Sequence, residues 1–203
     1  MLASQGTVAR ISCDSAILAS ILEEDCSLAI WERTPPPDLQ SLLETDPADI
    51  RFVASVEAIE PSLQDALDGA GYAASTASDR LAQDICELTR LYCQTLAISD
   101  VEVRLECVTT NSCRKWHSDY VSARLITTYL GDGTDWLDED DLARLEAGAE
   151  PTHIRSLATG DVGLFKGKLA AGKPAIHRSP PIAGIGQKRL LLVLNPKRDV
   201  IEG

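Results

Sequence analysis

The chain of 203 residues lacks most of the short motifs that identify a common enzyme class. It contains neither the GxxxxGK[ST] phosphate-binding loop nor a GxGxxG segment after a predicted strand. It has no GxSxG segment, so no nucleophilic serine is visible. Six cysteines are present, but no two are spaced as CxxC, which disfavours a zinc ribbon or finger. These absences disfavour nucleotide hydrolysis, serine acyl transfer and a structural zinc site.

Long apolar segments and excess positive charge are also missing. No apolar run approaches the roughly 20 residues that span a bilayer, and residues 1–10 lack the basic and apolar segments of a signal peptide. Acidic residues outnumber basic ones by 31 to 19, so the formal net charge is −12. That charge disfavours binding to nucleic acid or to an anionic membrane. We therefore expect a cytoplasmic protein that acts on a small molecule or a peptide. The oligomeric state stays open.

The first half of the chain predicts helices with short extended segments between them. The strongest helix is expected over residues 79–96. Its apolar side chains fall on one face: Leu81, Ile85, Leu88, Tyr92 and Leu96. Shorter helices are expected near residues 15–22, 37–43 and 61–69, and extended segments at 27–31 and 51–56. Residues 1–98 are thus predicted to form a helical N-terminal layer.

From Val101 onward the apolar residues alternate with polar ones, as they do in a half-buried strand. Strands are predicted at 101–107, 121–130, 161–166, 175–178 and 187–195. The last of these carries five consecutive apolar residues, so both of its faces should be covered. Short strands separated by glycine and proline predict a sandwich or a barrel over residues 99–203. An acidic segment at 137–150 is expected to form a solvated surface helix, or alternatively a lid over a site.

Three histidines are the main candidates for chemistry. His117 stands two positions before Asp119, and on a strand such residues point to the same face. His177 follows sixty residues later, and Arg189 opens the final strand twelve residues beyond it. Two imidazoles and one carboxylate can occupy one face of a divalent metal and leave three positions open. We predict His117, Asp119 and His177 as metal ligands, and His153 as an ordinary loop residue.

The pattern of these residues resembles the iron(II)/2-oxoglutarate-dependent dioxygenase superfamily. The HxD pair, the distal His and the later Arg of that family are matched by His117, Asp119, His177 and Arg189. Residues 124–130 (RLITTYL) also look like the strand of prolyl-hydroxylase-type members that ends in Tyr-Leu-Asn. The segment 159–165 is similar to the strand that precedes the distal His in the family. The resemblance covers about residues 99–196, and residues 117–136 also resemble an uncharacterised bacterial family near these enzymes.

The resemblance implies both a fold and an activity. The fold would be α+β, with N-terminal helices packed on a C-terminal double-stranded β-helix of the jelly-roll or cupin-like type. The activity would be a hydroxylase-type dioxygenase reaction with iron(II) and 2-oxoglutarate, on an unknown substrate. Arg189 and Tyr129 would bind the cosubstrate, because the forked donors of arginine suit a carboxylate. Arg124, Trp116 and Trp136 are candidates for the substrate side.

Two positions depart from the family pattern. Leu191 stands where many members carry Ser or Thr two residues after the Arg, and Gly131 replaces the usual Asn. The same three ligands suit zinc as well as iron, since two imidazoles and one carboxylate do not choose the metal by themselves. A cupin-like metal-binding or metal-sensing protein that performs no oxidation is therefore the alternative. An interaction domain with a decayed metal site is a third reading.

Overall fold

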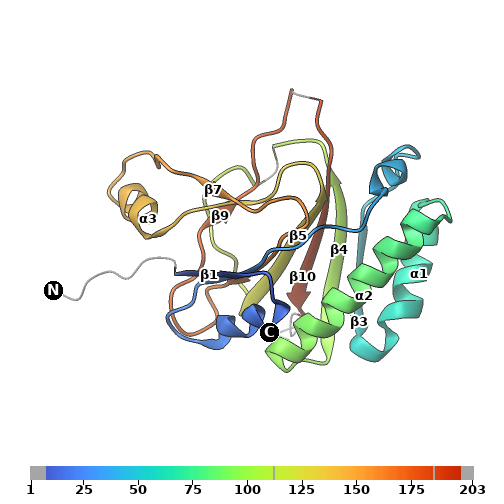
Figure 1. The fold of residues 1–203 in the computed structure, drawn as a ribbon, viewed down its shortest axis with the longest axis horizontal. Coiled ribbons are helices and arrows are strands. Elements are labelled where there is room, and N and C mark those ends of the chain that lie inside the picture. Colours follow the sequence, from blue (N-terminus) through green and yellow to red (C-terminus); the bar gives the residue numbers. More distant parts are fainter. Residues whose placement is uncertain (1–7, 112, 185, 198–203) are drawn as a thin grey trace, which may run out of the picture.

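The computed structural model describes residues 8–111, 113–184 and 186–197, and it has a mixed α+β architecture (Figure 1). The large sheet contains, in spatial order, β1 (Ala9–Ser12), β2 (Leu28–Trp31), β8 (Val162–Lys166), β5 (Ala123–Leu130), β10 (Arg189–Pro196), β4 (Asp100–Val108) and β3 (Ile50–Ser55). The small sheet contains β7 (Arg155–Ser156), β6 (Asp135–Trp136) and β9 (His177–Arg178). The helices are η1 (Ser15–Leu22), η2 (Leu39–Leu43), η3 (Val56–Ala58), α1 (Ile59–Ala70), α2 (Thr76–Leu96) and α3 (Glu139–Glu146).

The elements form three layers. Figure 1 shows α1 and α2 against one face of the large sheet, with β7 and β9 on its other side. Strand β10 pairs antiparallel with both β4 and β5, and it is buried along almost its whole length. The predicted covering of both faces of this strand is therefore confirmed. Within the described part of the chain, no helix combines the length and the hydropathy that crossing a membrane requires.

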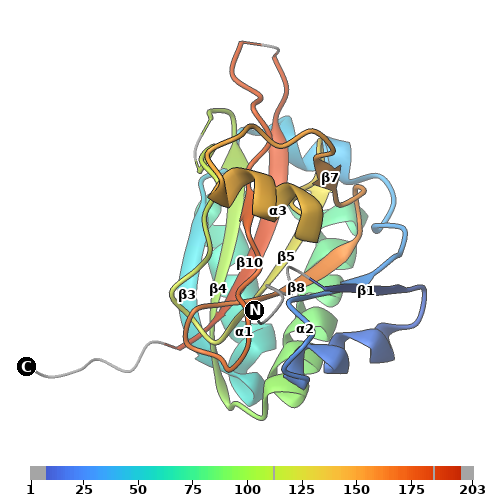
Figure 2. The ribbon, with the colours of Figure 1, turned by 90° about the vertical axis from the view of Figure 1, so that its left-hand side faces the viewer.

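After residue 99 the chain moves back and forth between the two sheets. Strands β4, β5, β8 and β10 lie in the large sheet, while β6, β7 and β9 lie in the small one. Between β4 and β5, residue His117 forms an isolated antiparallel bridge with His177 of β9. This alternation stacks the small sheet over the large one, as the view in Figure 2 shows with α3 in front of the large sheet. The space between the sheets is the inside of the strand-built half.

The predicted helical layer over residues 1–98 is not a layer separate from the strand-built half, although β2 and β3 match the extended segments expected at 27–31 and 51–56. Strands β1, β2 and β3 belong to the same large sheet as the later strands, through pairs such as β2 with β8 and β3 with β4. One core cluster joins side chains from both halves, including Leu81 of α2 and Leu192 of β10. The boundary at residue 98 therefore does not separate two units, because the N-terminal strands complete the sheet that the helices cover.

The strongest predicted helix is confirmed as α2, and its first residues follow a capping rule. The side chain of Ser75 accepts a hydrogen bond from the backbone N–H of Ser78, which satisfies an amide that has no partner within the helix. Strands β1, β6 and β7 have no counterpart among the predicted segments. Two-residue strands such as β6 and β7 are too short to show an alternating pattern.

A buried ion pair ties α2 to the sheet. Asp84 of α2 accepts hydrogen bonds from both terminal nitrogens of Arg33, the second at 2.8 Å. The hydroxyl of Tyr129 on β5 donates to the same carboxylate at 2.7 Å. Arg33 also donates from Nε to the carbonyl oxygen of Gly160 at 3.1 Å. The charges are buried, but every oxygen of Asp84 has a donor, so the pair fixes where the helix sits on the sheet.

We expect Asp84→Ala to lower the free energy of unfolding by about 3 kcal/mol, because it leaves Arg33 buried without its counter-charge. Urea unfolding followed by circular dichroism measures this loss. The matched control is Arg80→Ala on the same helix, whose ion pair with Asp38 is exposed and should contribute less than about 1 kcal/mol. Equal losses in the two variants would contradict the assignment.

Candidate metal centre

The structure brings together His117, Asp119 and His177, three residues that the sequence separates by up to sixty positions. Backbone N–H groups of the two histidines donate to each other's carbonyl oxygens, at 3.0 and 2.9 Å. One ligand-capable atom from each residue lies within 4.8 Å of the others. Nε2 of His177 is 3.2 Å from Oδ2 of Asp119, and Nε2 of His117 is 3.9 Å from Oδ1. It is the one cluster of this kind found among the described residues.

Backbone carbonyls orient both imidazole rings. Nδ1 of His117 lies 2.8 Å from the carbonyl oxygen of Lys115, and Nδ1 of His177 lies 3.3 Å from that of Ala175. These spacings fit donation from a protonated Nδ1, which leaves the lone pair of Nε2 free. In metal sites the same contact fixes the tautomer and the ring orientation. Both Nε2 atoms are therefore available on the side where Asp119 lies.

The carboxylate of Asp119 is buried, with 7% of its surface exposed. Burial alone would raise its pKa, but contact with His177 and the charges of Arg124 and His117 outweigh that effect, so its pKa lies below the usual value. Oδ1 accepts a hydrogen bond from Arg124, whereas Oδ2 has no hydrogen-bond partner among the described residues. An ionised carboxylate with one free oxygen, beside two free imidazole nitrogens, fits a divalent metal ion.

The turn after β8 holds the backbone of Asp119 in place. The N–H of Lys168 donates to the carbonyl oxygen of Asp119 at 2.8 Å, and the N–H of Leu169 donates to that of Val121 at 3.0 Å. This close approach requires glycine at position 167, because a Cβ atom there would lie 2.0 Å from the carbonyl oxygen of Val121. The site is thus braced by contacts that do not involve a metal.

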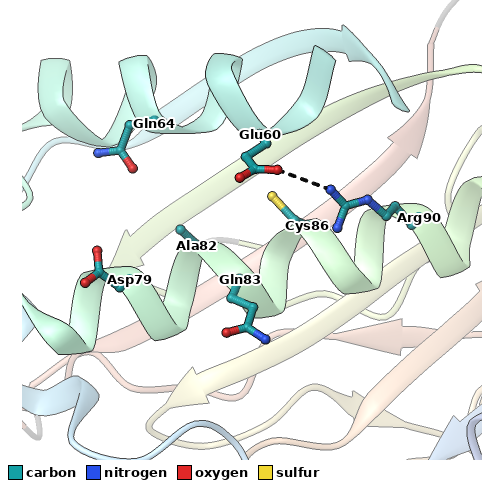
Figure 3. Close-up of a pocket in the computed structure, with 7 residues that line it drawn as sticks. All are labelled: Glu60, Gln64, Asp79, Ala82, Gln83, Cys86 and Arg90. Atoms are coloured by element: carbon teal, nitrogen blue, oxygen red, sulfur yellow. Dashed lines mark ion pairs between the residues drawn. The ribbon is translucent and has the colours of Figure 1, made fainter. Parts of the chain in front are cut away.

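A small cavity of about 80 Å³ lies beside the cluster, between the two sheets. Its wall includes His117 and His177 together with the apolar side chains Ile126, Leu191 and Val193. A larger surface hollow of about 390 Å³ lies between α1 and α2, where Figure 3 shows an ion pair between Glu60 and Arg90. That hollow contains no histidine. The chemistry-bearing residues therefore surround the smaller space.

Arg189 is fully buried at one end of β10. Its Nε donates to the carbonyl oxygen of Asp132 at 2.5 Å, and its terminal nitrogens donate to the hydroxyls of Ser179 at 3.3 Å and Thr128 at 3.2 Å. No carboxylate among the described residues forms an ion pair with it, and burial lowers its pKa. Ser179 lines the cavity and accepts a hydrogen bond from Arg189, so Arg189 lies directly behind the cavity wall.

Thr128 and Ser179 were not among the residues that the sequence pointed to. Ser179 lies two positions after His177, a spacing that places both on one face of a strand. Thr128 follows Thr127, whose side chain instead bonds to the carbonyl oxygen of Gly160. The His-x-Ser spacing could have identified Ser179. Nothing in the sequence shows that Thr128, and not Thr127, contacts Arg189.

Tyr129 does not line the cavity, which disfavours its expected role in cosubstrate binding. Its side chain lies on the helix-facing side of β5, in the core cluster that contains Leu125, and its hydroxyl bonds to Asp84. Burial and the charge of Asp84 raise its pKa well above the usual value. Neighbouring strand residues point to opposite faces, so Thr128 rather than Tyr129 faces the space between the sheets.

The three substrate-side candidates have different positions. Arg124 lines the cavity and bonds through Nη1 to Asp119 and through Nε to Asn195. Trp116 lies under the guanidinium of Arg178, with 4.3 Å between the guanidinium carbon and the ring centroid. Trp136 is buried in the apolar cluster of the small sheet, which favours the core role over substrate contact.

Comparison with known families assigns the sequence to one of them. A family model described as "Protein of unknown function (DUF1826)" matches residues 12–195. The chain belongs to the DUF1826 family. No curated protein matches the DUF1826 chain significantly.

Solved structures with a similar arrangement share little sequence with the DUF1826 chain. A prolyl-4-hydroxylase from Pseudomonas putida is 13% identical over 91% of this chain and 98% of that chain, with a TM-score of 0.47. The C-terminally truncated T7H of Neurospora crassa is 13% identical over 91% and 86%, with a TM-score of 0.43. A bsmA homolog from Methylobium petroleophilum is 14% identical over 89% and 91%, with a TM-score of 0.44.

We expect the DUF1826 chain to bind one divalent ion, and we expect His177→Ala to weaken that binding by at least about a hundredfold. Competition between the protein and a coloured chelator for zinc(II) or cobalt(II) measures the affinity. The third histidine provides the control: His153 is exposed and lies outside the cluster, so His153→Ala should bind the ion as the wild type does. Similar affinities in the two variants would place the ion elsewhere.

Proposed function

We propose that the DUF1826 chain is an iron(II)- and 2-oxoglutarate-dependent dioxygenase of the hydroxylase type. The observation that carries this proposal is the pairing of two features at one cavity. The first is the cluster of His117, Asp119 and His177, and the second is the fully buried Arg189, which forms no ion pair within the described part of the chain. A buried guanidinium is costly unless an anion neutralises it, so its position favours an anionic ligand that reaches past Ser179.

The order of the strands supports a double-stranded β-helix. In the large sheet β4, β10, β5 and β8 are neighbours, and in the small sheet β9 lies between β6 and the bridge at His117. Apart from β6 and β7, which follow each other in the small sheet, successive segments alternate between the two sheets, as they do in double-sheet jelly rolls. Strands β1 and β2 extend the large sheet beyond β8, and β3 extends it beyond β4.

In this proposal each residue at the cavity has a distinct task. His117, Asp119 and His177 would hold iron(II), which supplies the activation of dioxygen when it is bound. Arg189 would bind the distal carboxylate of 2-oxoglutarate through charge-assisted hydrogen bonds. The hydroxyls of Thr128 and Ser179 already accept from Arg189, so their own protons are free to be donated to the same carboxylate.

The apolar wall of the cavity has a protective task. Ile126, Leu191 and Val193 line the space beside the cluster, and all three are buried. They exclude water from the place where the oxidising chemistry would occur, which strengthens the electrostatic contacts there and limits side reactions. Leu191 stands where many family members carry a hydroxyl, and here Thr128 and Ser179 supply the hydroxyls next to Arg189.

A cupin-like protein that binds zinc or iron without oxidation is the second candidate. The size of the cavity favours it, because about 80 Å³ holds only two or three water molecules. Measurement of succinate formation separates the two candidates. Iron-loaded protein that neither binds 2-oxoglutarate nor forms succinate would be a metal-binding protein and not a dioxygenase.

We expect Arg189→Gln to weaken 2-oxoglutarate binding by about a hundredfold while metal affinity stays unchanged, because the variant removes the counter-charge of the distal carboxylate. Titration of 2-oxoglutarate into anaerobic iron(II)-loaded protein, followed by visible absorption, gives the affinity. Lys188→Gln is the matched control, since Lys188 is the preceding residue and pairs with Asp46 at the surface. Loss of metal and cosubstrate binding together would give Arg189 a role in folding instead.

A further inference from the structure

The charged side chains around the cavity are mostly cationic, although the whole chain carries a formal charge of −12. Three arginines line the cavity, one from each of three strands: Arg104 from β4, Arg124 from β5 and Arg178 from β9. Glu106 is the one acidic residue in the lining. The exposed Arg114 and Lys115 precede His117 in the adjoining loop and make no ion pair within the described residues. Each lining arginine pairs with a carboxylate, that of Glu106, Asp119 or Asp135, so the arginines contribute unused hydrogen-bond donors rather than a net positive charge.

Each of these arginines has N–H donors that form no hydrogen bond within the described residues. Arg178 bonds only through Nε, to Asp135 at 3.0 Å, so both of its terminal nitrogens lack a partner among the described residues. Arg104 directs Nε and Nη2 at a single oxygen of Glu106, which leaves Nη1 without one. Arg124 uses Nε and Nη1, and its Nη2 makes no bond to the described part of the chain. A guanidinium has five N–H donors, so a ligand with oxygen acceptors can bind here without breaking the existing contacts.

The orientation of Arg178 is fixed before any ligand arrives. Asp135 holds its Nε, and Asp135 is itself held by the hydroxyl of Ser156 at 2.7 Å. The ring of Trp116 supports the flat face of the guanidinium. Arg178 is also the residue directly after His177. A pre-ordered planar cation loses little entropy when it binds a carboxylate or a phosphate through two parallel hydrogen bonds.

We propose that the substrate of this site is a small molecule with a carboxylate or phosphate group, which Arg178 and Arg104 bind at the mouth of the cavity. This inference rests on the proposed dioxygenase function, since it names the substrate class of the same centre. It is distinct from the cosubstrate position, because Arg189 is fully buried whereas Arg104 and Arg178 are partly exposed. Arg104 and Arg178 form the rim of the cavity, and their unused N–H donors favour a small ligand with anionic oxygen acceptors. The negative charge of the whole chain disfavours a polyanion.

The test uses metal-loaded protein saturated with 2-oxoglutarate, so that the metal and Arg189 are already occupied. Inorganic phosphate, acetate and the neutral acetamide are titrated separately at constant ionic strength, and tryptophan fluorescence reports binding near Trp116. Phosphate or acetate should saturate and acetamide should not. Tighter binding of phosphate or of acetate identifies the anionic group. Equal binding of acetamide, or a response that never saturates, overturns the proposal.

Variants separate the rim from the cosubstrate site. Arg178→Gln and Arg104→Gln should each weaken anion binding by about tenfold, because each removes a charged hydrogen-bond donor. Arg80→Gln, a distant exposed residue of α2, should leave anion binding as in the wild type. Arg104→Gln alone still tests the proposal if Arg178→Gln does not fold. Unchanged anion affinity in a folded rim variant overturns it.

A second titration keeps this result independent of the proposed function. Phosphate is titrated without 2-oxoglutarate into Arg189→Gln and into the double variant that also carries Arg104→Gln. The Arg104→Gln change should weaken phosphate binding as much in this background as it does in the wild type. If 2-oxoglutarate fails to bind the metal-loaded wild type, the dioxygenase proposal fails while the anion site remains measurable. If 2-oxoglutarate binds but the affinity for the anion is the same with and without Arg104 and Arg178, the substrate inference fails and the dioxygenase proposal stands.

Discussion

The alternation of side chains along β10 is the constraint on which the rest of the structure depends. The strand lies in the middle of the large sheet and is covered on both sides. Leu190, Leu192 and Leu194 enter the core under the helices, while Leu191 and Val193 enter the cluster between the sheets. A shift of one residue in pairing would exchange these two sets. The pairing of β10 with β4 and β5 therefore decides which side chains reach the cavity.

Two buried arginines show how differently the fold treats a cation. Arg33 is paired with Asp84 and joined by Tyr129, so its charge is neutralised within the protein and serves to position α2. Arg189 donates to a carbonyl oxygen and two hydroxyls, and no carboxylate of the described residues forms an ion pair with it. The first arrangement is a complete ion pair, whereas the second has hydrogen bonds and only the longer-range charges of Asp132 and Asp135. That contrast distinguishes a structural ion pair from a place prepared for an anion.

The sequence predicts features that depend on neighbouring residues. It does not predict features that depend on which face of a strand a residue occupies or on partners far along the chain. The His117–x–Asp119 spacing and the apolar run of β10 were enough to predict two cluster residues and a doubly covered strand, because both depend on short-range periodicity. The third cluster residue, His177, was predicted from the family pattern and not from local spacing. The placement of Tyr129 failed, since one position along β5 separates the two faces of the sheet and its partner Asp84 lies on a helix 45 residues away. Strands β2 and β3 were also missed as part of the large sheet, because their partners β8 and β4 come more than forty residues later in the chain.

The backbone bridge between His117 and His177 has a consequence for how an ion is acquired. Two main-chain hydrogen bonds hold these residues side by side, and carbonyls set the angle of each ring, so assembly of the ligand set does not wait for the ion. The conformational cost of bringing distant ligands together is already met during folding. An apoprotein built in this way keeps its shape when its ion is withdrawn and accepts another without refolding, so the choice among iron, zinc and their neighbours falls to geometry and to relative availability.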